Sequence, residues 1–348
     1  MSKTNIEWAT HTQNHQAGCN RVSPACGRCY AAILSVRLAN MGMELYEGVT
    51  NGDLSNPKWT GKIRQALPKM KKNFREIRRA TKPRRTFLGS MTDLFHESVN
   101  MNSSFMAEFA KEIESLRNGC RTNQILMLLT KRPRTLLHFQ QHYFPQGFPE
   151  QIWVGVTAEN QKWADDRIPI LCQVKASVRF LSCEPMFGEI KLEKIWKENL
   201  EWIIAGGESG HQARNHSPQW FRSLRDQAVA AEIPFHFKQW GEWDPTGSKV
   251  GKKVAGRELD GRTWDEFPER VQRYHSLPSW IVGKVPMPDF NFHLDWIRDH
   301  LTQNPSEMRW TTGPKVSPLP NTEAAPQGQE RATYEQRGPA VPLTTKWW

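Results

Sequence analysis

The stretch Gln124-Ile-Leu-Met-Leu-Leu-Thr-Lys-Arg132 is a β-forming apolar run that ends abruptly in polar residues. Five further runs of the same kind occupy residues 86–90, 152–157, 178–183, 202–206 and 234–238. Apolar runs of this length, with few polar interruptions, are typical of strands that are buried on both faces of a sheet. The chain is therefore expected to fold around one buried central sheet.

Between these runs lie segments with apolar residues at helical spacing. They cover residues 103–116, 134–142, 159–171 and 217–231, and the last of them begins with a Ser-Pro pair that favours the start of a helix. Strands that alternate with helices predict a mostly parallel sheet with crossover helices. The expected fold class is therefore α/β.

Polar residues follow each apolar run, at the point where the strand should end. In a closed or nearly closed barrel such residues converge at one mouth, whereas an open doubly wound sheet gathers them at one switch point. We favour a partial (β/α) barrel. The polar residues in question are Ser90, Thr92, Asp93, Thr130, Lys131, Arg132, Glu159, Asn160, Glu184, Gly206, Gly207, Glu208 and Lys238.

The composition favours a soluble protein with an anionic partner. The formal net charge is +11, and residues 58–85 are basic with few acids between them. Such a stretch is either a solvated helix face or a surface for nucleic-acid phosphates. The sequence contains no run of about 18 apolar residues and no apolar signal sequence, so we expect a cytoplasmic protein without a membrane partner.

Three cysteines lie close together in Cys19-Asn-Arg-Val-Ser-Pro-Ala-Cys26-Gly-Arg-Cys29-Tyr30. Thiolates bind zinc or iron, and a fourth ligand from His15 or His11 would complete a zinc site. Without a fourth protein ligand, a 4Fe–4S cluster would keep one iron open to a small molecule. The spacing alone favours zinc, and the barrel expected behind the cysteines shifts the balance towards iron.

Several segments of the chain resemble a phage and bacterial family, formerly of unknown function, that carries a three-cysteine motif like that of radical S-adenosylmethionine (SAM) enzymes. The resemblance spans about residues 4–268. The matching segments are Asn5-Ile-Glu-Trp8, Gly18-Cys19, Val22-Ser-Pro-Ala-Cys-Gly-Arg-Cys-Tyr-Ala31, Ser90-Met-Thr-Asp-Leu-Phe-His-Glu97, Leu129-Thr-Lys-Arg-Pro133, Val154-Gly-Val-Thr-Ala-Glu-Asn160, Phe180-Leu-Ser-Cys-Glu-Pro185, Ala205-Gly-Gly-Glu-Ser-Gly210, Phe237-Lys-Gln-Trp-Gly-Glu-Trp243 and Gly251-Lys-Lys-Val-Ala-Gly-Arg257.

This resemblance implies a radical SAM-type partial barrel with a cluster in the loop after the first strand. Cys19, Cys26 and Cys29 would bind three irons of a 4Fe–4S cluster, and SAM would chelate the fourth. An electron donor would then drive cleavage of SAM to methionine and a 5′-deoxyadenosyl radical. The spacing here is six residues and then two, whereas three and then two is commonest in radical SAM enzymes, so the cluster loop is expected to be longer.

The resemblance also gives roles to residues at the strand ends that would bind SAM. Asp93 would pair with the methionine ammonium group, with Ser90 and Thr92 beside it. Glu159 or Asn160 would bind the ribose hydroxyls. For each of these residues a helix cap or a buried ion pair is an equally weighted alternative.

Other strand-end residues are candidates for backbone contact or for catalysis. Gly206 and Gly207 would let the backbone approach adenine or methionine closely. Glu184 and Glu208 would handle an amine or a proton of the substrate, and Lys238 would serve an anionic group. The same structural alternatives apply to them.

Members of the resembled family are similar to a phage radical SAM isomerase that acts in thymidine hypermodification, a DNA modification linked to restriction evasion. It converts 5-Nα-glycinylthymidine in DNA to the Cα-linked isomer, so DNA carrying a modified thymidine, or the modified nucleotide, is the expected substrate. The alternatives are a radical SAM lyase or repair enzyme on nucleic acid and a non-catalytic, zinc-binding, DNA-binding protein. The expected organisation is a barrel over residues 1–240, a covering loop and helical appendage over 241–300, and a disordered tail over 301–348.

Overall fold

A computed structural model describes residues 2–117 and 124–268 of the chain. The predicted helical appendage, which begins at residue 269, and the predicted disordered tail over 301–348 lie outside the described residues. The description below concerns the described part alone.

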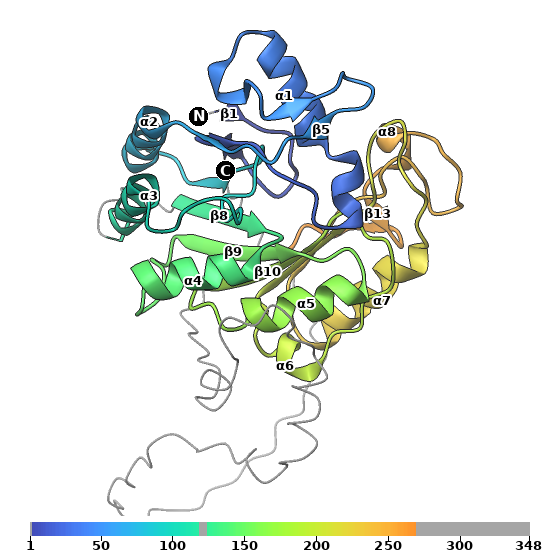
Figure 1. The fold of residues 1–348 in the computed structure, drawn as a ribbon. Helices are drawn as coiled ribbons and strands as arrows, with labels where there is room; N and C mark the ends of the chain where they lie inside the picture. The colour runs from blue at the N-terminus through green and yellow to red at the C-terminus, as the bar shows by residue number, and fades with distance from the viewer. Residues whose placement is uncertain (1, 118–123, 269–348) are drawn as a thin grey trace, which may run out of the picture. The chain divides into compact units, whose positions relative to one another are not determined.

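An eight-stranded sheet forms the centre of this part (Figure 1). All neighbouring strands in it are parallel except the first pair, which is antiparallel. The strands are β1 (Ser2–Lys3), β2 (His11–Gln13), β7 (Arg84–Leu88), β8 (Gln124–Thr130), β9 (Ile152–Thr157), β10 (Val178–Cys183), β11 (Trp202–Gly206) and β12 (Phe235–Gln239). The predicted α/β class with a mostly parallel sheet is confirmed.

The strand order is β1-β2-β7-β8-β9-β10-β11-β12. The strands therefore lie side by side in the order in which they occur in the sequence, and this order never reverses. A doubly wound sheet has a reversal in its strand order, which creates the switch point. The sheet therefore has no switch point, and polar residues from all its strand ends are free to share one edge.

Six helices connect the strands and pack against the same face of the sheet (Figure 1). Alternate strand residues such as Leu128, Val154, Leu181 and Ile203 point into the apolar core that these helices share. The helices are α2 (Leu67–Arg79), α3 (Ser104–Glu114), α4 (Pro133–Tyr143), α5 (Gln161–Leu171), α6 (Lys194–Lys197) and α7 (Pro218–Ala230). No helix of the described residues is long and apolar enough to cross a membrane.

The opposite face of the sheet carries a second apolar cluster. Met127, Trp153, Phe180 and Trp202 belong to it, and Trp8 from the N-terminal segment packs on them. The Trp8 ring lies 5.0 Å from that of Phe87. This face is therefore filled with aromatic side chains beneath the strand ends.

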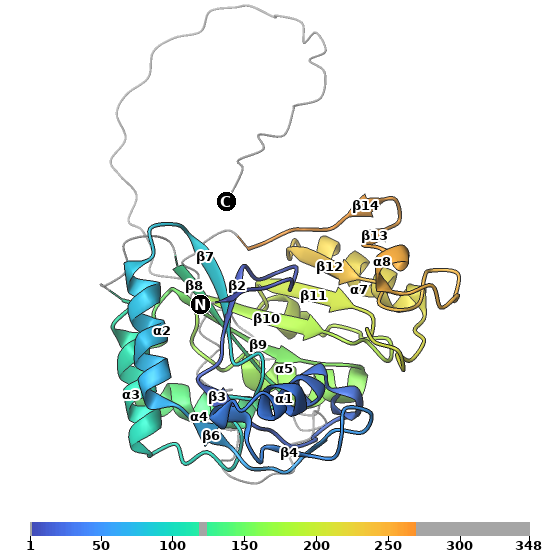
Figure 2. The same ribbon diagram turned by 90° about the horizontal axis from the view of Figure 1, so that it is seen from above.

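Short elements surround the C-terminal edge of the sheet (Figure 2). Two small antiparallel pairs and a helix lie between β2 and α2, and a short helix and hairpin follow β12. These elements are β3 (Gln16–Ala17), η1 (Pro24–Arg28), α1 (Tyr30–Asn40), η2 (Glu44–Tyr46), β4 (Thr50–Asn51), β5 (Lys58–Trp59), β6 (Arg64–Gln65), α8 (Lys252–Ala255), β13 (Glu258–Leu259) and β14 (Arg262–Thr263).

His15 is buried in the aromatic core next to α2 and α3. Its ring lies 5.2 to 6.4 Å from those of Phe74, Phe105 and Phe109, and neither ring nitrogen has a hydrogen-bond partner among residues 2–117 and 124–268. Burial, with a smaller contribution from the charge of Lys69, lowers the pKa of His15 to about 3. The folded protein therefore resists protonation of this ring.

This burial predicts acid sensitivity. Below pH 6.5 the unfolded chain binds a proton at His15 that the folded chain does not, so stability falls by up to about 1.4 kcal/mol per pH unit until the folded pKa is reached. His15→Phe should remove this contribution, about 2 kcal/mol between pH 6.5 and pH 5. Urea unfolding of both proteins across that range measures it. Equal losses of stability in the two proteins would show that His15 is not the cause.

Candidate functional site

The strand ends open on a cavity of about 420 Å³. Residues that follow β7, β8, β10 and β11, together with the ends of β9 and β12, line it. They include Ser90, Thr92, Asp93, Thr130, Lys131, Arg132, Thr157, Ser182, Glu184, Gly207, Glu208, Ser209, Lys238 and Gln239. The predicted convergence of polar strand-end residues at one place is therefore confirmed for most of the set.

All three clustered cysteines line the same cavity. They lie on one stretch, residues 18–30, which we call the cysteine segment. Cys19, Cys26 and Cys29 are free thiols of intermediate exposure, and Cys29 is the residue at which α1 begins. Burial raises the pKa of Cys19 to about 12, with Asp93 adding to the rise and Arg132 opposing it. Burial also raises the pKa of the Cys29 thiol.

Neither histidine that was predicted as a fourth zinc ligand lies beside the cysteines. His15 lies in the aromatic core and His11 on β2 contacts Thr10, so neither predicted fourth ligand is among the residues that line the cavity. In the described ranges, no three His, Cys, Asp or Glu side chains converge where they could hold one metal ion.

Asp93, at the end of β7, has both carboxylate oxygens occupied by donors from the protein. Its Oδ1 accepts hydrogen bonds from the Thr130 hydroxyl at 2.7 Å and from the backbone N–H of Phe95 at 3.1 Å. Its Oδ2 accepts from the backbone N–H of Lys131 at 3.0 Å and from Arg132 at 2.9 Å. The carboxylate thus joins the ends of two neighbouring strands.

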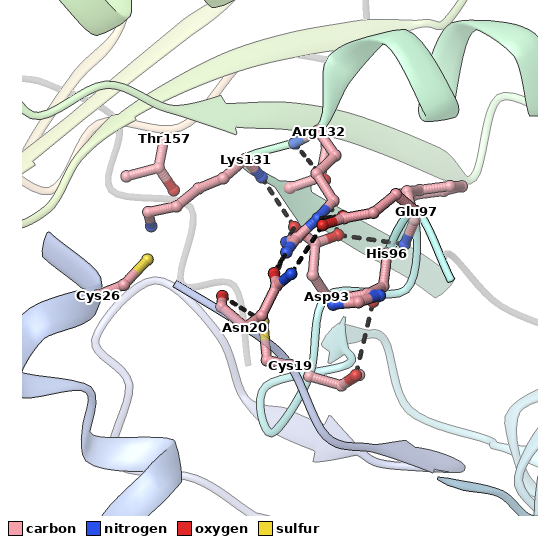
Figure 3. A network of polar contacts seen from close by, with 12 residues as sticks. Cys19, Asn20, Cys26, Asp93, His96, Glu97, Lys131, Arg132 and Thr157 are labelled. Atoms are coloured by element: carbon pink, nitrogen blue, oxygen red, sulfur yellow. Dashed lines mark hydrogen bonds and ion pairs between the residues drawn. The ribbon is translucent and has the colours of Figure 1, made fainter. Parts of the chain in front are cut away.

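Arg132 carries this network on to the first cysteine (Figure 3). Its guanidinium group, which is almost fully buried, donates to Asp93, to Glu97 and to the side-chain oxygen of Asn20. One of its nitrogens also lies 3.8 Å from Cys19 Sγ. Burial alone would raise the pKa of Glu97, but hydrogen bonds from Arg132 and Asn20 lower it to about 2. Arg132 therefore fixes the start of the cysteine segment.

A second carboxylate–arginine pair lies after β9. Glu159 and Arg167 have fully buried side chains, with 2.9 Å between Glu159 Oε2 and Arg167 Nη1. The same nitrogen donates to the carbonyl of Thr157 at 2.6 Å, and the guanidinium lies over the Trp163 ring. The other Glu159 oxygen accepts a hydrogen bond from the Ser23 hydroxyl. This pair therefore holds the middle of the cysteine segment.

A third pair lies after β11. Arg214 makes hydrogen bonds to both carboxylate oxygens of Glu208, at 2.5 and 2.9 Å. Arg214 also donates to the carbonyl of Pro24 at 3.2 Å, and Arg28 lies 3.6 Å from Glu208. This pair fixes the part of the cysteine segment that contains Cys26.

Four residues that were predicted to contact SAM or substrate make contacts within the protein. Asp93 has no free oxygen for an ammonium group, Glu159 is buried away from the cavity, and Glu208 is occupied by Arg214. Asn160 accepts from the N–H of Trp163 and caps α5. These contacts give the first three a positioning role towards the cysteines and make Asn160 a helix cap. Their predicted contacts with SAM or substrate stay predictions.

Ser90 and Thr92 line the cavity as predicted but also support the cysteine segment. The Thr92 hydroxyl donates to the carbonyl of Gly18 at 2.6 Å, and Ser90 exchanges hydrogen bonds with Asn14. The Tyr30 hydroxyl donates to the carbonyl of Ser90 at 2.6 Å. Gly18 has φ +101, and a side chain there would collide with the backbone of Lys62, which makes glycine necessary before Cys19.

Gly206 and Gly207 are glycines for packing reasons that the sequence did not reveal. A methyl group on Gly207 would collide with the carbonyl oxygen of Trp240 and lie 2.9 Å from the His216 ring. On Gly206 it would lie 3.3 Å from Glu184 Oε1, a tight but tolerable contact, and Gly206 does not line the cavity.

Gly207→Ala is therefore expected to cost about 3 kcal/mol of stability, the upper end of the usual range for overpacking, because backbone must move to admit the methyl group. Gly206→Ala, its neighbour, should cost clearly less. Urea unfolding of the two variants measures the difference. Equal stability of the two variants would mean that the approach of Trp240 to Gly207 does not constrain the site.

All three predicted catalytic residues, Glu184, Glu208 and Lys238, line the cavity, and Glu184 and Lys238 pair with each other. Lys238 Nζ lies 3.1 Å from Glu184 Oε1, and both residues line the cavity. The other carboxylate oxygen accepts from the Trp8 indole N–H at 3.0 Å and from the Ser182 hydroxyl at 3.1 Å. This pair faces the same space as the three cysteines.

Sequence reasoning missed the N-terminal segment as part of the site. Glu7 and Trp8 line the cavity, and so does Lys252, which pairs with Glu7 at 3.0 Å. The only available signal was the Asn5-Ile-Glu-Trp8 stretch, whose place above the strand ends is set by contacts far along the chain. Asn20 and Arg214 were missed for the same reason.

Comparison with known proteins places this cavity within one family. Residues 3–268 match a family described as "Protein of unknown function (DUF5131)". The chain belongs to the DUF5131 family. Every cavity residue, from Asn5 to Lys252, lies inside the DUF5131 match. No curated protein and no solved structure matches the chain.

Proposed function

We propose that this DUF5131 protein is a radical SAM enzyme that modifies nucleic acid. The observation that carries the proposal is the position of Cys19, Cys26 and Cys29. They are free thiols on one segment that follows the first parallel strand, and they line a cavity at the C-terminal ends of a sheet wound in one direction. This arrangement is the one expected of a radical SAM-type partial (β/α) barrel.

The three cysteines would hold a 4Fe–4S cluster whose fourth iron has no protein ligand. Together with bound SAM and an electron donor, such a cluster supplies reductive cleavage of SAM to methionine and a 5′-deoxyadenosyl radical. The protein supplies binding, orientation and protection from water. Arg132, Ser23 and Arg214 maintain the positions of the cysteines through the three carboxylate–arginine pairs described above.

Lys131 is a candidate for contact with an anionic group in the cavity. Its backbone N–H is used by Asp93, but among the described residues its ammonium group has no ion pair. Its side chain extends away from the Arg132 network, to the side of the cavity where Cys26 lies (Figure 3). A carboxylate or phosphate of a bound molecule would satisfy this charge.

The floor of the cavity suits radical chemistry because apolar groups form part of it. The apolar lining consists of Ile6, Trp8, Phe87 and Leu129. All four belong to or pack against the second apolar cluster, on the face of the sheet opposite the helices. Apolar walls exclude water and leave few reactive groups near a radical. The polar groups of the cavity wall come from the strand ends, the N-terminal segment, the cysteine segment and Lys252.

The substrate proposal depends on charge and on the family resemblance. The helix α2 exposes Lys71, Lys72, Arg75 and Arg79, and Lys82 follows it. Lys71 is paired with Glu108, which leaves a row of basic side chains for phosphate contacts. The leading reaction is isomerisation of 5-Nα-glycinylthymidine to 5-Cα-glycinylthymidine in DNA, with the base turned out of the duplex into the cavity.

Anaerobic incubation of the iron- and sulfide-loaded protein with SAM and dithionite tests this function. We expect 5′-deoxyadenosine, and we expect DNA containing the glycinyl base to yield the Cα-linked nucleoside after digestion and mass spectrometry. A lost or cleaved base would instead indicate a lyase or repair enzyme. Bound zinc without 5′-deoxyadenosine would indicate a non-catalytic DNA-binding protein.

A further inference from the structure

Within the described part of the chain, three acceptor oxygens on side chains of cavity-lining residues receive no hydrogen bond. They are Glu7 Oε2, Glu184 Oε1 and Gln239 Oε1, all shielded from solvent, and all three residues line the cavity. A buried acceptor without a donor costs free energy, and native proteins rarely leave several in one place. Their presence around one cavity indicates a bound group that brings N–H donors.

The geometry fixes Gln239 as an acceptor. Its side-chain N–H₂ donates to the carbonyl of Gly207 at 3.1 Å and to the Ser209 hydroxyl at 2.9 Å. The carbonyl of Gly207 can only accept, so the amide cannot be turned round without losing that bond. The amide oxygen of this buried residue is therefore left for another donor.

Glu184 is held in place by its other oxygen. Oε2 accepts from Trp8 and Ser182, whereas Oε1 lies 3.1 Å from Lys238 Nζ at an angle that does not make a hydrogen bond. The Glu184 carboxylate is therefore held in one orientation, while its Oε1 can still accept a hydrogen bond. Glu7 is similar, since one oxygen pairs with Lys252 and the other has no donor.

We propose that Glu7, Glu184 and Gln239 form a subsite for an amino group carried by the substrate base. The nucleobase part rests on the proposed function, whereas the amine part rests on the three oxygens. An ammonium or secondary amine offers two or more N–H donors and is attracted by the two carboxylates. When this amine binds, it lies beside Lys238 or displaces Lys238 from Glu184.

An anion would fit this end of the cavity poorly. It would face two carboxylates and an amide oxygen, and the nearby cations Lys238 and Lys252 already have carboxylate partners. The Trp8 indole N–H is also used, by Glu184. Positive charge without a partner lies instead at Lys131, towards the cysteines.

Calorimetric titration of the full-length protein tests the subsite without requiring catalysis. The probes are 5-aminomethyl-2′-deoxyuridine and thymidine, which share the nucleoside and differ in the amine. We expect the amine probe to bind about tenfold more tightly or better, as for a hydrogen-bonded charge. Equal affinities, or no binding of the amine probe, would overturn the proposal.

Two variants separate the subsite from a structural role. Glu184→Gln should abolish the preference for the amine probe, whereas Lys238→Met should increase it, because the probe then has no cation to displace. Glu198→Gln, at an exposed carboxylate on the surface, is the matched control and should leave the preference unchanged. Circular dichroism establishes that the variants are folded. A preference that persists in Glu184→Gln would contradict the assignment.

Competition with S-adenosylhomocysteine distinguishes a subsite for substrate from a subsite for SAM. It should bind without displacing the amine probe, since the subsite is assigned to substrate. Displacement would assign the three oxygens to SAM and overturn the proposal. This outcome is independent of the proposed function, which fails instead if loaded protein forms no 5′-deoxyadenosine.

Discussion

Arg132→Met is expected to lower the free energy of unfolding by about 3–5 kcal/mol, the usual cost of removing one partner of a buried ion pair. Asp93 is only 6% exposed and would lose its charged partner, and Asn20 and Glu97 would lose theirs. The cost is large because the Asp93 carboxylate stays buried after its charged partner is removed. Urea unfolding measures it.

Hydrogen exchange and a control variant test this prediction further. Hydrogen exchange at the backbone of residues 18–22 should accelerate in Arg132→Met, since the guanidinium holds this stretch. Lys194→Met removes a cation whose 3.9 Å pair with Glu198 is exposed, and it should change stability little. If Arg132→Met is as stable as Lys194→Met, the pair with Asp93 does not hold the cysteine segment.

Cys26→Ser is expected to abolish cluster assembly and SAM cleavage. Three thiolates are the whole protein ligand set in the proposed site, and a serine hydroxyl is a much poorer ligand for iron than a thiolate. Cys19→Ser and Cys29→Ser should behave in the same way. The readouts are iron and sulfide content after anaerobic loading and the yield of 5′-deoxyadenosine.

Cys172→Ala is the matched control for these variants. Cys172 is buried at the end of α5, in the core between helices and sheet, and it does not line the cavity. This variant should bind iron and cleave SAM like the unaltered protein. Full activity of Cys26→Ser, or equal loss in Cys172→Ala, would remove the cysteine assignment.

The sequence predicted the sheet well because its strands are continuous apolar runs. The predicted bounds of β8, β9, β10 and β11 agree with the structure, and β12 differs by one residue at each end. The strand β2 was not predicted. It has three residues, His11-Thr-Gln13, with no apolar side chain, and it becomes a strand only because β7 pairs with it.

The site was predicted less completely than the sheet, because its contacts join distant parts of the chain. Ser23 and Glu159 are 136 residues apart in sequence, and Pro24 and Arg214 are 190 residues apart. Strand-end position alone showed that these acids gather near the cysteines. It could not show that Asp93, Glu159 and Glu208 each face an arginine.

The carboxylate–arginine pairs also explain how a chain with a basic composition can build a cavity with few free cations. Arg132, Arg167 and Arg214 are used within the protein, so their charges support the cysteine segment. The basic residues Lys72, Arg75 and Arg79 on α2 are instead exposed to solvent. Net charge alone therefore does not distinguish structural arginines from binding ones.

Iron and sulfide analysis of the anaerobically loaded protein, together with its visible spectrum, tests the central claim most directly. The account predicts about four irons and four sulfides per chain, with the broad visible absorption of an iron–sulfur cluster that bleaches on reduction. Stoichiometric zinc, with neither sulfide nor visible absorption, would contradict it.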